Sequence, residues 1–463
     1  MITQKVYATD IKGRLDPFFY DAKVLGVKNR LTKKYGQHKL GEVIDDIYRY
    51  PTFYGFSFDK QGVPVIKGEN VSDEGIINKE QDFDCVSIEI HEKYPRTALE
   101  KDDLVFTVRG VIGKTGFYDG FAENANISPN VIKIRIKKNH NARFYWVFLN
   151  SSIGQQLIQN LASGQVQKTI TVPDIKNIQV PLVSETTQNK IVTIIQNAYK
   201  NREEKLKQAD ELLNSIDDYV RQQLGIDYAE PEEEKIYTVK SQDLEDNRQD
   251  PYYYNPKFVN LLNTVSSKLK MVSLSDISEG VFNGNTPAKD KYTNEGKPIV
   301  KVSCLKKNKI EWSNLSYAKD KKLNKHLKDN DILLLSSAHQ AEYLGKNPCL
   351  VEIPDDLRER DITFVGELIC IRPNTKLVNP YYLLAILRLD EYHQLINREK
   401  RGQTSHIYPN DLEKIAIPLA DKGKQDTIAQ EFTNRLNKAE DLKNEASKLL
   451  EEAKKKVEAM ILN

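Results

Sequence analysis

Two stretches of the chain repeat apolar side chains at intervals of three and four residues, with charged residues between them. The apolar positions are Leu206, Ala209, Leu213, Ile216 and Val220 in the first stretch and Ala439, Leu442, Ala446, Leu449 and Ala453 in the second. This spacing places them in one narrow stripe along an α-helix. A narrow stripe suits a single partner helix, so we expect the two helices to pair antiparallel in a coiled-coil-like manner. The alternative is an amphipathic helix that lies on its own domain.

The ends of both helices are marked in the sequence. Ser184 and Asp421 each stand three residues after a proline, and both are good N-cap residues, whose side-chain oxygens accept hydrogen bonds from the first turn. Gly225 and Pro231 end the first helix. A helix of about 40 residues extends roughly 60 Å, which is longer than most single domains need and therefore favours a spacer.

The remainder of each half alternates short β-branched or aromatic runs with clusters of Gly, Asn and Asp. The runs are residues 63–66, 104–108 and 131–136 in the first half and residues 299–302, 332–335 and 367–371 in the second. Such runs are typical of strands joined by turns. Helical patterns at residues 145–161 and 381–395 lie between them, so the pattern predicts an α+β fold.

The two halves also share landmarks at matched spacing. The phrase Arg-Leu-Asp-Pro-Phe-Phe-Tyr at residues 14–20 returns as Arg-Gln-Asp-Pro-Tyr-Tyr-Tyr at residues 248–254. Asp174, Pro181 and Gln188 are matched by Asp411, Pro418 and Gln425. Two distant landmarks in each copy indicate a tandem duplication. We interpret both phrases as structural, because Asp and Pro start a turn and the aromatic rings pack it.

The expected organisation follows from these patterns. Two tandem domains related by a pseudo-two-fold axis cover residues 1–183 and 248–420, the helices cover 184–226 and 421–463, and an acidic linker covers 227–247. A chain with the same module twice suits a partner that itself has two related parts. Double-stranded DNA with a bipartite site is the commonest such partner.

Composition narrows the function classes only a little. The net charge of +2 neither requires nor excludes nucleic acid, because a local basic face can be balanced by acidic residues elsewhere. The four cysteines form no close pair, so we expect small core residues rather than disulfides or a zinc site. No signal segment or membrane-spanning run is present in the sequence, and we expect a cytoplasmic protein with no membrane partner.

Motifs that resemble catalytic ones lack the rest of their pattern. Gly113-Lys114-Thr115 would end a phosphate-binding loop, but the first glycine of that loop would fall at Val108. Asn379-Pro380 resembles part of a methyltransferase loop but is better explained as a helix start. The seven histidines show no metal-ligand spacing. We therefore expect no catalytic residue, no cofactor and no metal site.

Together these features resemble the specificity (S) subunits of Type I restriction–modification systems, which have two target recognition domains and two helical spacers. The resemblance rests on the duplicated Arg-x-Asp-Pro opening, on residues 103–114, on the Gly164-Gln165 loop that leads to Asp174, and on the entry to the long helix at residues 181–188. In the second copy residues 331–337 depart from the glycine-rich form, and Gly345-Lys346 is reached only after an insertion.

The resemblance implies a non-catalytic DNA reader. Such subunits bind a bipartite sequence of double-stranded DNA, one half per domain. They recruit two adenine methyltransferase (M) subunits and, for restriction, an ATP-dependent restriction/translocase (R) subunit. Two readings of other classes remain: a protein-interaction scaffold that uses only the helices, or a methyltransferase or nuclease whose motifs are not recognisable.

Candidate DNA-binding residues follow from residue type and loop position. They are Arg49, Tyr50, Lys67, Arg109, Lys114, Gln165 and Gln167 in the first copy and Asn283, Asn285, Lys301, Ser337, His339, Gln340, Gln403 and His406 in the second. Arg, Lys, Asn, Gln and Ser side chains bind base edges or phosphates, and for each of them a solvated surface role is the alternative. Positions expected to be exposed for partner docking on the first helix are Tyr199, Arg202, Glu203 and Lys207.

Overall fold

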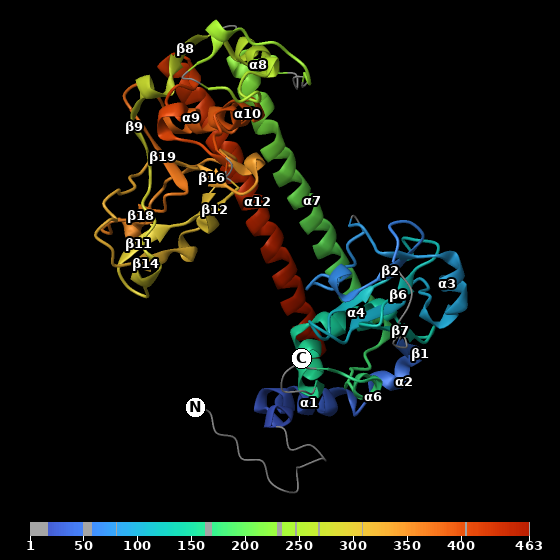
Figure 1. Ribbon diagram of the computed structural model, residues 1–463. Helices are drawn as coiled ribbons and strands as arrows, with labels where there is room; N and C mark the ends of the chain where they lie inside the picture. Colours follow the sequence, from blue (N-terminus) through green and yellow to red (C-terminus); the bar gives the residue numbers. More distant parts are fainter. Residues whose placement is uncertain are drawn as a thin grey trace. The chain divides into compact units, whose positions relative to one another are not determined.

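The computed structural model describes residues 17–49, 58–79, 81–162, 169–228, 234–245, 248–266, 269–307, 309–402 and 405–462. The chain forms two compact units (Figure 1): the first comprises Met1–Lys205 with Glu445–Asn463, and the second comprises Leu206–Asn444. Two long helices, α7 (Glu185–Leu224) and α12 (Lys422–Leu462), contribute part of their length to each unit. Each unit mixes helices and short strands, which confirms the α+β prediction.

The first unit is built around two small sheets. The larger has the order β1-β7-β4-β5, with β1 (Ile44–Arg49), β7 (Val131–Ile136), β4 (Leu104–Thr107) and β5 (Thr115–Phe117). The smaller has the order β3-β2-β6, with β3 (Cys85–Val86), β2 (Val63–Ile66) and β6 (Asn126–Ile127). Neighbouring strands are antiparallel except β2 and β6, which are parallel.

Helices pack against the sheets of the first unit. They are α1 (Ala22–Tyr35), α2 (Leu40–Val43), α3 (Ile88–Lys93), α4 (Ala142–Asn150), α5 (Ser152–Leu161) and α6 (Val172–Lys176), with the 3-10 turns η2 (Pro17–Tyr20), η3 (Gly68–Asn70) and η4 (Pro95–Thr97). Of these helices, α3 packs against the smaller sheet. Asn141 and Ser151 cap α4 and α5 through their side-chain oxygens. The buried side chains of α4 and α5 share one core with β1, β4 and β7.

The second unit repeats this arrangement. Its larger sheet has the order β9-β19-β15-β17, with β9 (Ser278–Asn283), β19 (Leu368–Pro373), β15 (Ile332–Leu335) and β17 (Cys349–Leu350). Its second sheet also has four strands, one more than its counterpart in the first unit, in the order β10-β14-β11-β18, with β10 (Tyr292–Thr293), β14 (Ser316–Ala318), β11 (Lys297–Val300) and β18 (Thr363–Phe364). Two-stranded pairs are β8 (Lys270–Ser273) with β21 (Ala416–Leu419), β12 (Leu305–Lys306) with β13 (Lys309–Ile310), and β16 (Ser337–Ala338) with β20 (Ser405–His406).

The four α-helices described between α7 and α12 in the second unit follow the order of α1, α4, α5 and α6 in the first. They are α8 (Pro256–Ser266), α9 (Pro380–Leu387), α10 (Asp390–Arg398) and α11 (Pro409–Leu412), with the 3-10 turns η5 (Ser241–Asp243), η6 (Leu274–Ile277), η7 (Lys289–Lys291), η8 (Val302–Cys304), η9 (Trp312–Asn314), η10 (Ala341–Tyr343) and η11 (Asp355–Leu357). Helices α9 and α10 lie beside α12 (Figure 1), and their buried leucines share a core with Ile428 and Phe432.

A buried ion pair occurs at the same place in both units. Asp103, directly before β4, accepts two hydrogen bonds of 2.8 Å from the guanidinium of Arg135 on β7. Asp331, directly before β15, accepts the same two bonds of 2.8 Å from Arg372 on β19. The residue before each aspartate has a φ of 73°, which is left-handed backbone. The duplication expected from the sequence is therefore present at the level of individual side-chain geometry.

The repeated aromatic phrase has a structural role in the second copy. Arg248 is buried, its Nη2 donates to the carbonyl oxygens of Arg398 and Lys400, and its guanidinium lies 3.9 Å from the ring centroid of Tyr253. This confirms the structural interpretation for residues 248–254. Residues 14–16 of the first phrase lie outside the described residues.

The two long helices pair antiparallel within each unit. In the second unit Asp210 lies 3.7 Å from Lys443, and Arg435 donates to the carbonyl oxygen of Ser215 at 2.8 Å. In the first unit Lys205 and Glu445 form an ion pair of 2.5 Å. Because the residue numbers fall on one helix as they rise on the other, the helices run in opposite directions, as predicted.

The apolar stripe differs from the prediction at two positions, Leu206 on α7 and Leu449 on α12. Leu206 is only partly buried. Leu449 is only partly buried, and Leu450 takes its place in the core with Ala446, Ala453 and Val457. A spacing of four, three and four from Ala446 keeps the stripe close to the period of 3.6 residues per turn. The stripe on α7 is buried as expected at Ala209, Leu213, Ile216 and Val220.

The predicted caps of the long helices are present. The Ser184 hydroxyl accepts the Thr187 N–H at 3.3 Å, and the Asp421 carboxylate accepts the Lys424 N–H at 3.0 Å. Gly225, with a φ of 68°, ends α7. The four cysteines are buried and free. Among the described residues, the helices are all too short or too polar to cross a membrane.

Candidate functional site

Several predicted DNA-binding residues lie at one edge of the first unit. Strands β1 and β4 both run antiparallel to β7, so their C-terminal ends meet at the start of β7. Arg49 at the end of β1 lies opposite Ile132, and the loop of residues 108–114 follows β4. Strand β2 ends beside β6, whose chain turns at residues 128–130 into β7. We call Arg49, Lys67 and residues 108–114 and 128–130 the first edge.

The first edge encloses a hollow of about 440 Å³ that brings three predicted residues together. Lys67, Arg109 and Lys114 line it, together with Phe58 and residues 128–130. Lys67 forms an ion pair with Asp84. Lys114 lies 2.6 Å from Asp73 and lowers the pKa of that carboxyl, first through its hydrogen bond. Arg109 is exposed, and in the described part of the chain it forms no ion pair.

The loop of residues 108–114 is held firmly from below. The Thr107 hydroxyl donates to the carbonyl oxygen of Val111 at 2.6 Å. From α5, the side-chain amide of Gln155 donates to the carbonyl oxygen of Gly113 at 2.8 Å, and that of Gln159 donates to the carbonyl oxygen of Ile112 at 3.0 Å. Preorganised loops of this kind bind a ligand with little loss of conformational entropy.

The second unit has an equivalent edge. Asn283 ends β9 opposite Ile369, as Arg49 ends β1 opposite Ile132, and Lys301 follows β11 as Lys67 follows β2. We call Asn283, Lys301 and residues 336–346 and 365–367 the second edge.

Gly345 occupies the position of Gly113. The Gly345 N–H donates to the carbonyl oxygen of Leu335 at 2.8 Å, and the Gly113 N–H donates to the carbonyl oxygen of Thr107 at 2.9 Å. Both glycines have positive φ, and a Cβ on either would clash with an isoleucine of the helix below. The intervening loop, however, has nine residues (336–344) in the second unit and five (108–112) in the first.

The longer loop forms a two-stranded ribbon. Ser337 pairs with His406 and Ala338 with Ser405. The His406 ring stacks on Tyr408 with centroids 6.3 Å apart, and His339 and Gln340 follow as exposed residues. Four predicted residues, Ser337, His339, Gln340 and His406, therefore gather on or directly after this ribbon.

Two predicted asparagines hold loops together instead of facing outward. The Asn283 side-chain amide donates to the Ser336 hydroxyl and to the carbonyl oxygen of Gly366, both at 3.1 Å. The Asn285 amide donates to the carbonyl oxygen of Lys322 at 2.6 Å and to the Asn324 side chain at 2.9 Å. Their N–H donors are engaged within the unit, because each asparagine sits where several carbonyl groups converge. Lys301 lies over the Tyr292 ring.

The remaining predictions fall elsewhere. Tyr50, Gln165, Gln167 and Gln403 lie outside the described residues. The expectation that Tyr199 is exposed is wrong: its hydroxyl donates to the carbonyl oxygen of Glu74 at 2.9 Å, its ring packs on Trp146, and burial raises its pKa.

The other three positions that we expected to be exposed on α7 differ in their surroundings. Arg202 is also engaged by Glu74, at 3.4 Å, because the loop that carries Glu74 folds over this part of α7. Glu203 and Lys207 are exposed.

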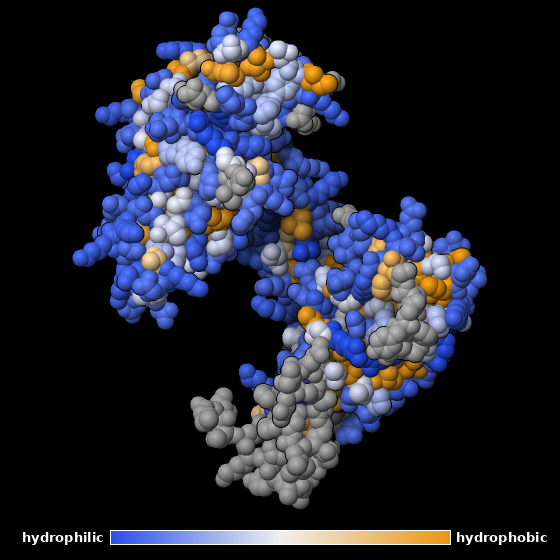
Figure 2. Space-filling view, in the orientation of Figure 1, coloured by the Kyte–Doolittle hydropathy of each residue, from blue (hydrophilic) through white to orange (hydrophobic). Residues whose placement is uncertain are grey.

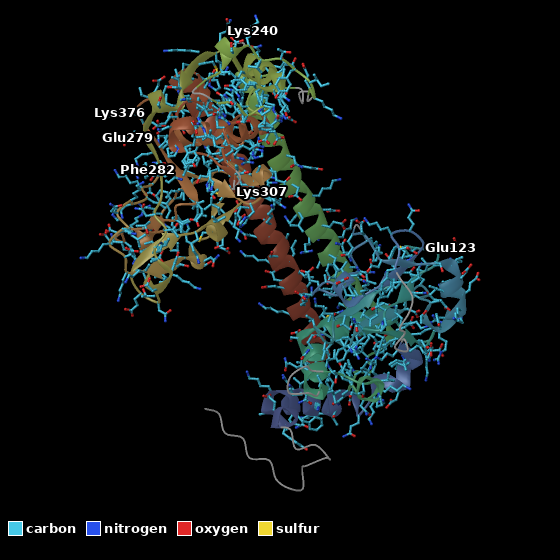
Figure 3. All side chains as sticks on the ribbon, in the orientation of Figure 1. Glu123, Lys240, Glu279, Phe282, Lys307 and Lys376 are labelled. Carbon is cyan, nitrogen blue, oxygen red and sulfur yellow. The ribbon has the colours of Figure 1, made fainter. Side chains whose placement is uncertain are left out.

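Lysines that sequence reasoning missed lie at the second edge. Lys325 donates to the carbonyl oxygen of Asn283 at 2.7 Å, and Lys346 follows Gly345 as Lys114 follows Gly113. The ammonium of Lys325 and the guanidinium of Arg372 lie 5.8 and 5.3 Å from the ring centroid of Phe282 on β9 (Figure 3), within range of cation–π contacts. The signal was present in the sequence, because residues 319–328 contain five lysines. The visible face of this unit is mainly hydrophilic (Figure 2).

The family of the chain follows from comparison with known proteins. A model of the family described as Type I restriction modification DNA specificity domain matches residues 33–213 and again residues 266–452. The chain belongs to this family. Each match covers the strands and the edge of one unit, so the DNA specificity domain occurs twice.

Individual relatives agree with the family. The chain is 29% identical over 186 residues to the putative type I restriction enzyme MjaX specificity subunit of Methanocaldococcus jannaschii. The aligned segment covers 38% of this chain and 42% of that protein. It is 26% identical over 134 residues to the type I restriction enzyme EcoBI specificity subunit of Escherichia coli, which covers 28% of each. The aligned part is thus less than half of each relative.

The fold is shared with a solved chain of a type I R-M system, at a TM-score of 0.51 and 14% identity over 91% of this chain and 95% of that chain.

Proposed function

We propose that this chain is the DNA-recognition subunit of a type I restriction–modification complex and that each unit binds one half of a bipartite duplex site. The observation that supports this most directly is the duplicated edge. The sheets β1-β7-β4-β5 and β9-β19-β15-β17 have equivalent strand orders and the same Asp–Arg pair, while the loops that follow β4 and β15 differ in length and chemistry. A constant framework with divergent loops suits the recognition of two different short sequences.

The groups at the two edges have the chemistry that base recognition needs. Arg109 can form paired hydrogen bonds with guanine O6 and N7. Ser337, Gln340 and His406 offer donors and acceptors to base edges, and Lys325 and Lys346 offer positive charge to phosphates. The long helices α7 and α12 would act as the spacer that sets the gap between the half-sites, with residues 1–183 and 248–420 as the recognition domains.

The same proposal assigns the chemistry to partners. The chain recognises the DNA sequence and recruits two methyltransferase (M) subunits and, for restriction, R subunits. We place this complex in the cytoplasm, where it has access to the DNA. The exposed residues Glu203 and Lys207 remain candidates for partner contact.

The test is selection of duplexes from a random library with the purified full chain. We expect a bipartite consensus with a fixed gap and an affinity that falls steeply as salt rises, because phosphate contacts release counterions. Selection of a single contiguous motif, or binding that salt does not weaken, would contradict the proposal. Removing one helical turn from α7 together with one from α12 should change the preferred gap.

A further inference from the structure

The tip of the first edge exposes an apolar side chain between charged ones. Val111 is 59% exposed, and Phe58, which lines the same hollow, is 40% exposed. The side chain of Ile112, by contrast, is buried beneath the loop. Burying an exposed valine is favourable by about 0.8 kcal/mol per methylene-sized group, so a ligand that covers Val111 would gain affinity.

The loop around Val111 presents this side chain in a defined position. Its carbonyl oxygen is held by the Thr107 hydroxyl, and the backbone turns through two left-handed glycines, Gly110 (φ 74°) and Gly113 (φ 89°). A Cβ added at Gly110 would meet nothing within 4 Å, so the space beside the tip is open. The apolar tip is therefore both rigid and accessible.

The charges around the tip indicate what covers it. Asp84 and Asp73 engage Lys67 and Lys114, whereas Arg109, two residues before Val111, forms no ion pair with any described residue. An unpaired guanidinium beside an apolar tip matches the major groove, where guanine presents two acceptors and thymine presents a methyl group.

We propose that Val111 reads a thymine 5-methyl group in the major groove and that Arg109 reads a guanine within two base pairs of that thymine. This inference rests on the proposed function and adds to it the chemistry of one half-site. Phe58 lines the same hollow, with the Lys67 ammonium 4.6 Å from its ring centroid. The ribbon of the second unit offers mainly polar groups, from Ser337, Ser405 and His406, and the inference concerns the first half-site.

The experiment replaces thymines by deoxyuridine, which removes only the methyl group. The full chain first selects its bipartite site from a random duplex library. The half-site of the first unit is the one whose consensus changes in Arg109→Ala and stays the same in Gln340→Ala. Each thymine of the selected duplex is then replaced singly, and Kd is measured. We expect one thymine of that half-site, within two base pairs of a guanine, to cost about fourfold in affinity when its methyl is removed.

The valine variants make the assignment specific. In Val111→Ala the fourfold effect should disappear, with an unchanged melting temperature. The matched control is Val259→Ala, which alters a valine of similar exposure (56%) on α8 and should keep the fourfold effect.

The outcomes separate two failures. A bipartite site with no deoxyuridine-sensitive thymine in the first half, or an effect that persists in Val111→Ala, overturns this inference and leaves DNA recognition intact. A chain that selects no sequence overturns the proposed function and this inference together.

Discussion

The two units share one framework and differ in the loops at its edge. The Asp103–Arg135 and Asp331–Arg372 pairs have the same bond lengths, and Gly113 and Gly345 make the same turn. The first unit then presents a short loop with an arginine and an exposed valine, whereas the second presents a polar ribbon formed with β20. The sheets β1-β7-β4-β5 and β9-β19-β15-β17 thus share their framework, while the loops at their edges differ.

The junction between each unit and its long helix is equally constant. Gln188 accepts the Asn141 N–H and donates to the carbonyl oxygen of Val183, and Gln425 does the same with Asn379 and Ala420. Both glutamines are buried and lie in the first turns of α7 and α12. The contacts of the framework are therefore more alike in the two units than the residues at their edges.

The largest effect is expected from breaking the buried ion pairs. Replacing Asp331 by Ala leaves Arg372 without its carboxylate, and replacing Asp103 by Ala leaves Arg135 with only the exposed Glu100. Each change should lower the free energy of unfolding by about 3 kcal/mol, the lower end for buried pairs, because Arg372 and Arg135 keep 18% and 25% exposure. The measurement is urea unfolding in single-tryptophan backgrounds, since Trp146 reports on the first unit and Trp312 on the second. A cost in only one unit would contradict the equivalence of the frameworks.

A smaller effect is expected at the matched glycines. Gly113→Ala and Gly345→Ala combine positive φ with a Cβ 2.6 or 2.4 Å from an isoleucine methyl, and each should cost about 2–3 kcal/mol. Gly110→Ala has the same backbone strain without the clash and should cost about 1 kcal/mol. Thermal unfolding checks this order, and equal costs at all three positions would show that the isoleucines move aside.

The loops should affect DNA binding independently. Arg109→Ala should reduce discrimination by about 1–3 kcal/mol in one half-site only, and Gln340→Ala should act in the other half-site. Because the residues lie in different units, the double variant should be additive within about 0.5 kcal/mol. Kd values on duplexes with single base changes provide the measurement, and coupling between the variants would show that the units do not read separately.

The smallest expected effect is a dependence of the stability of the second unit on pH. Burial lowers the pKa of His393, and Lys346 lowers it further. The folded state therefore resists protonation, and stability should fall as pH drops below the ordinary histidine value of 6.5, because the unfolded chain takes up the proton first.

A variant of His393 tests this pH dependence, and a partly buried histidine of the first unit serves for comparison. The pKa of His140 in the first unit is also lowered by burial. His393→Gln should flatten the pH dependence seen by Trp312 and leave that seen by Trp146 unchanged, and an unchanged slope at Trp312 would exclude His393 as its source.

Local signals in the sequence predicted much of the fold. Ser184 and Asp421 cap the long helices because capping depends on a side chain and the next few backbone groups. Arg109 and Lys114 lie at one edge because loops at the ends of neighbouring strands meet there. Tyr199 was misassigned because the segment that covers it, around Glu74, is distant in the sequence.

By itself, the sequence determined the duplication, the helical stripes and their ends, and the loops that carry the proposed recognition residues, because all of these depend on residue type and short-range spacing. Only the tertiary structure decided that Asn283 is engaged by carbonyl groups, that Ser337 pairs with His406, and that Val111 is exposed while Ile112 is buried. The physical reason is that hydrogen-bond partners and burial are set by segments that meet only when the chain folds.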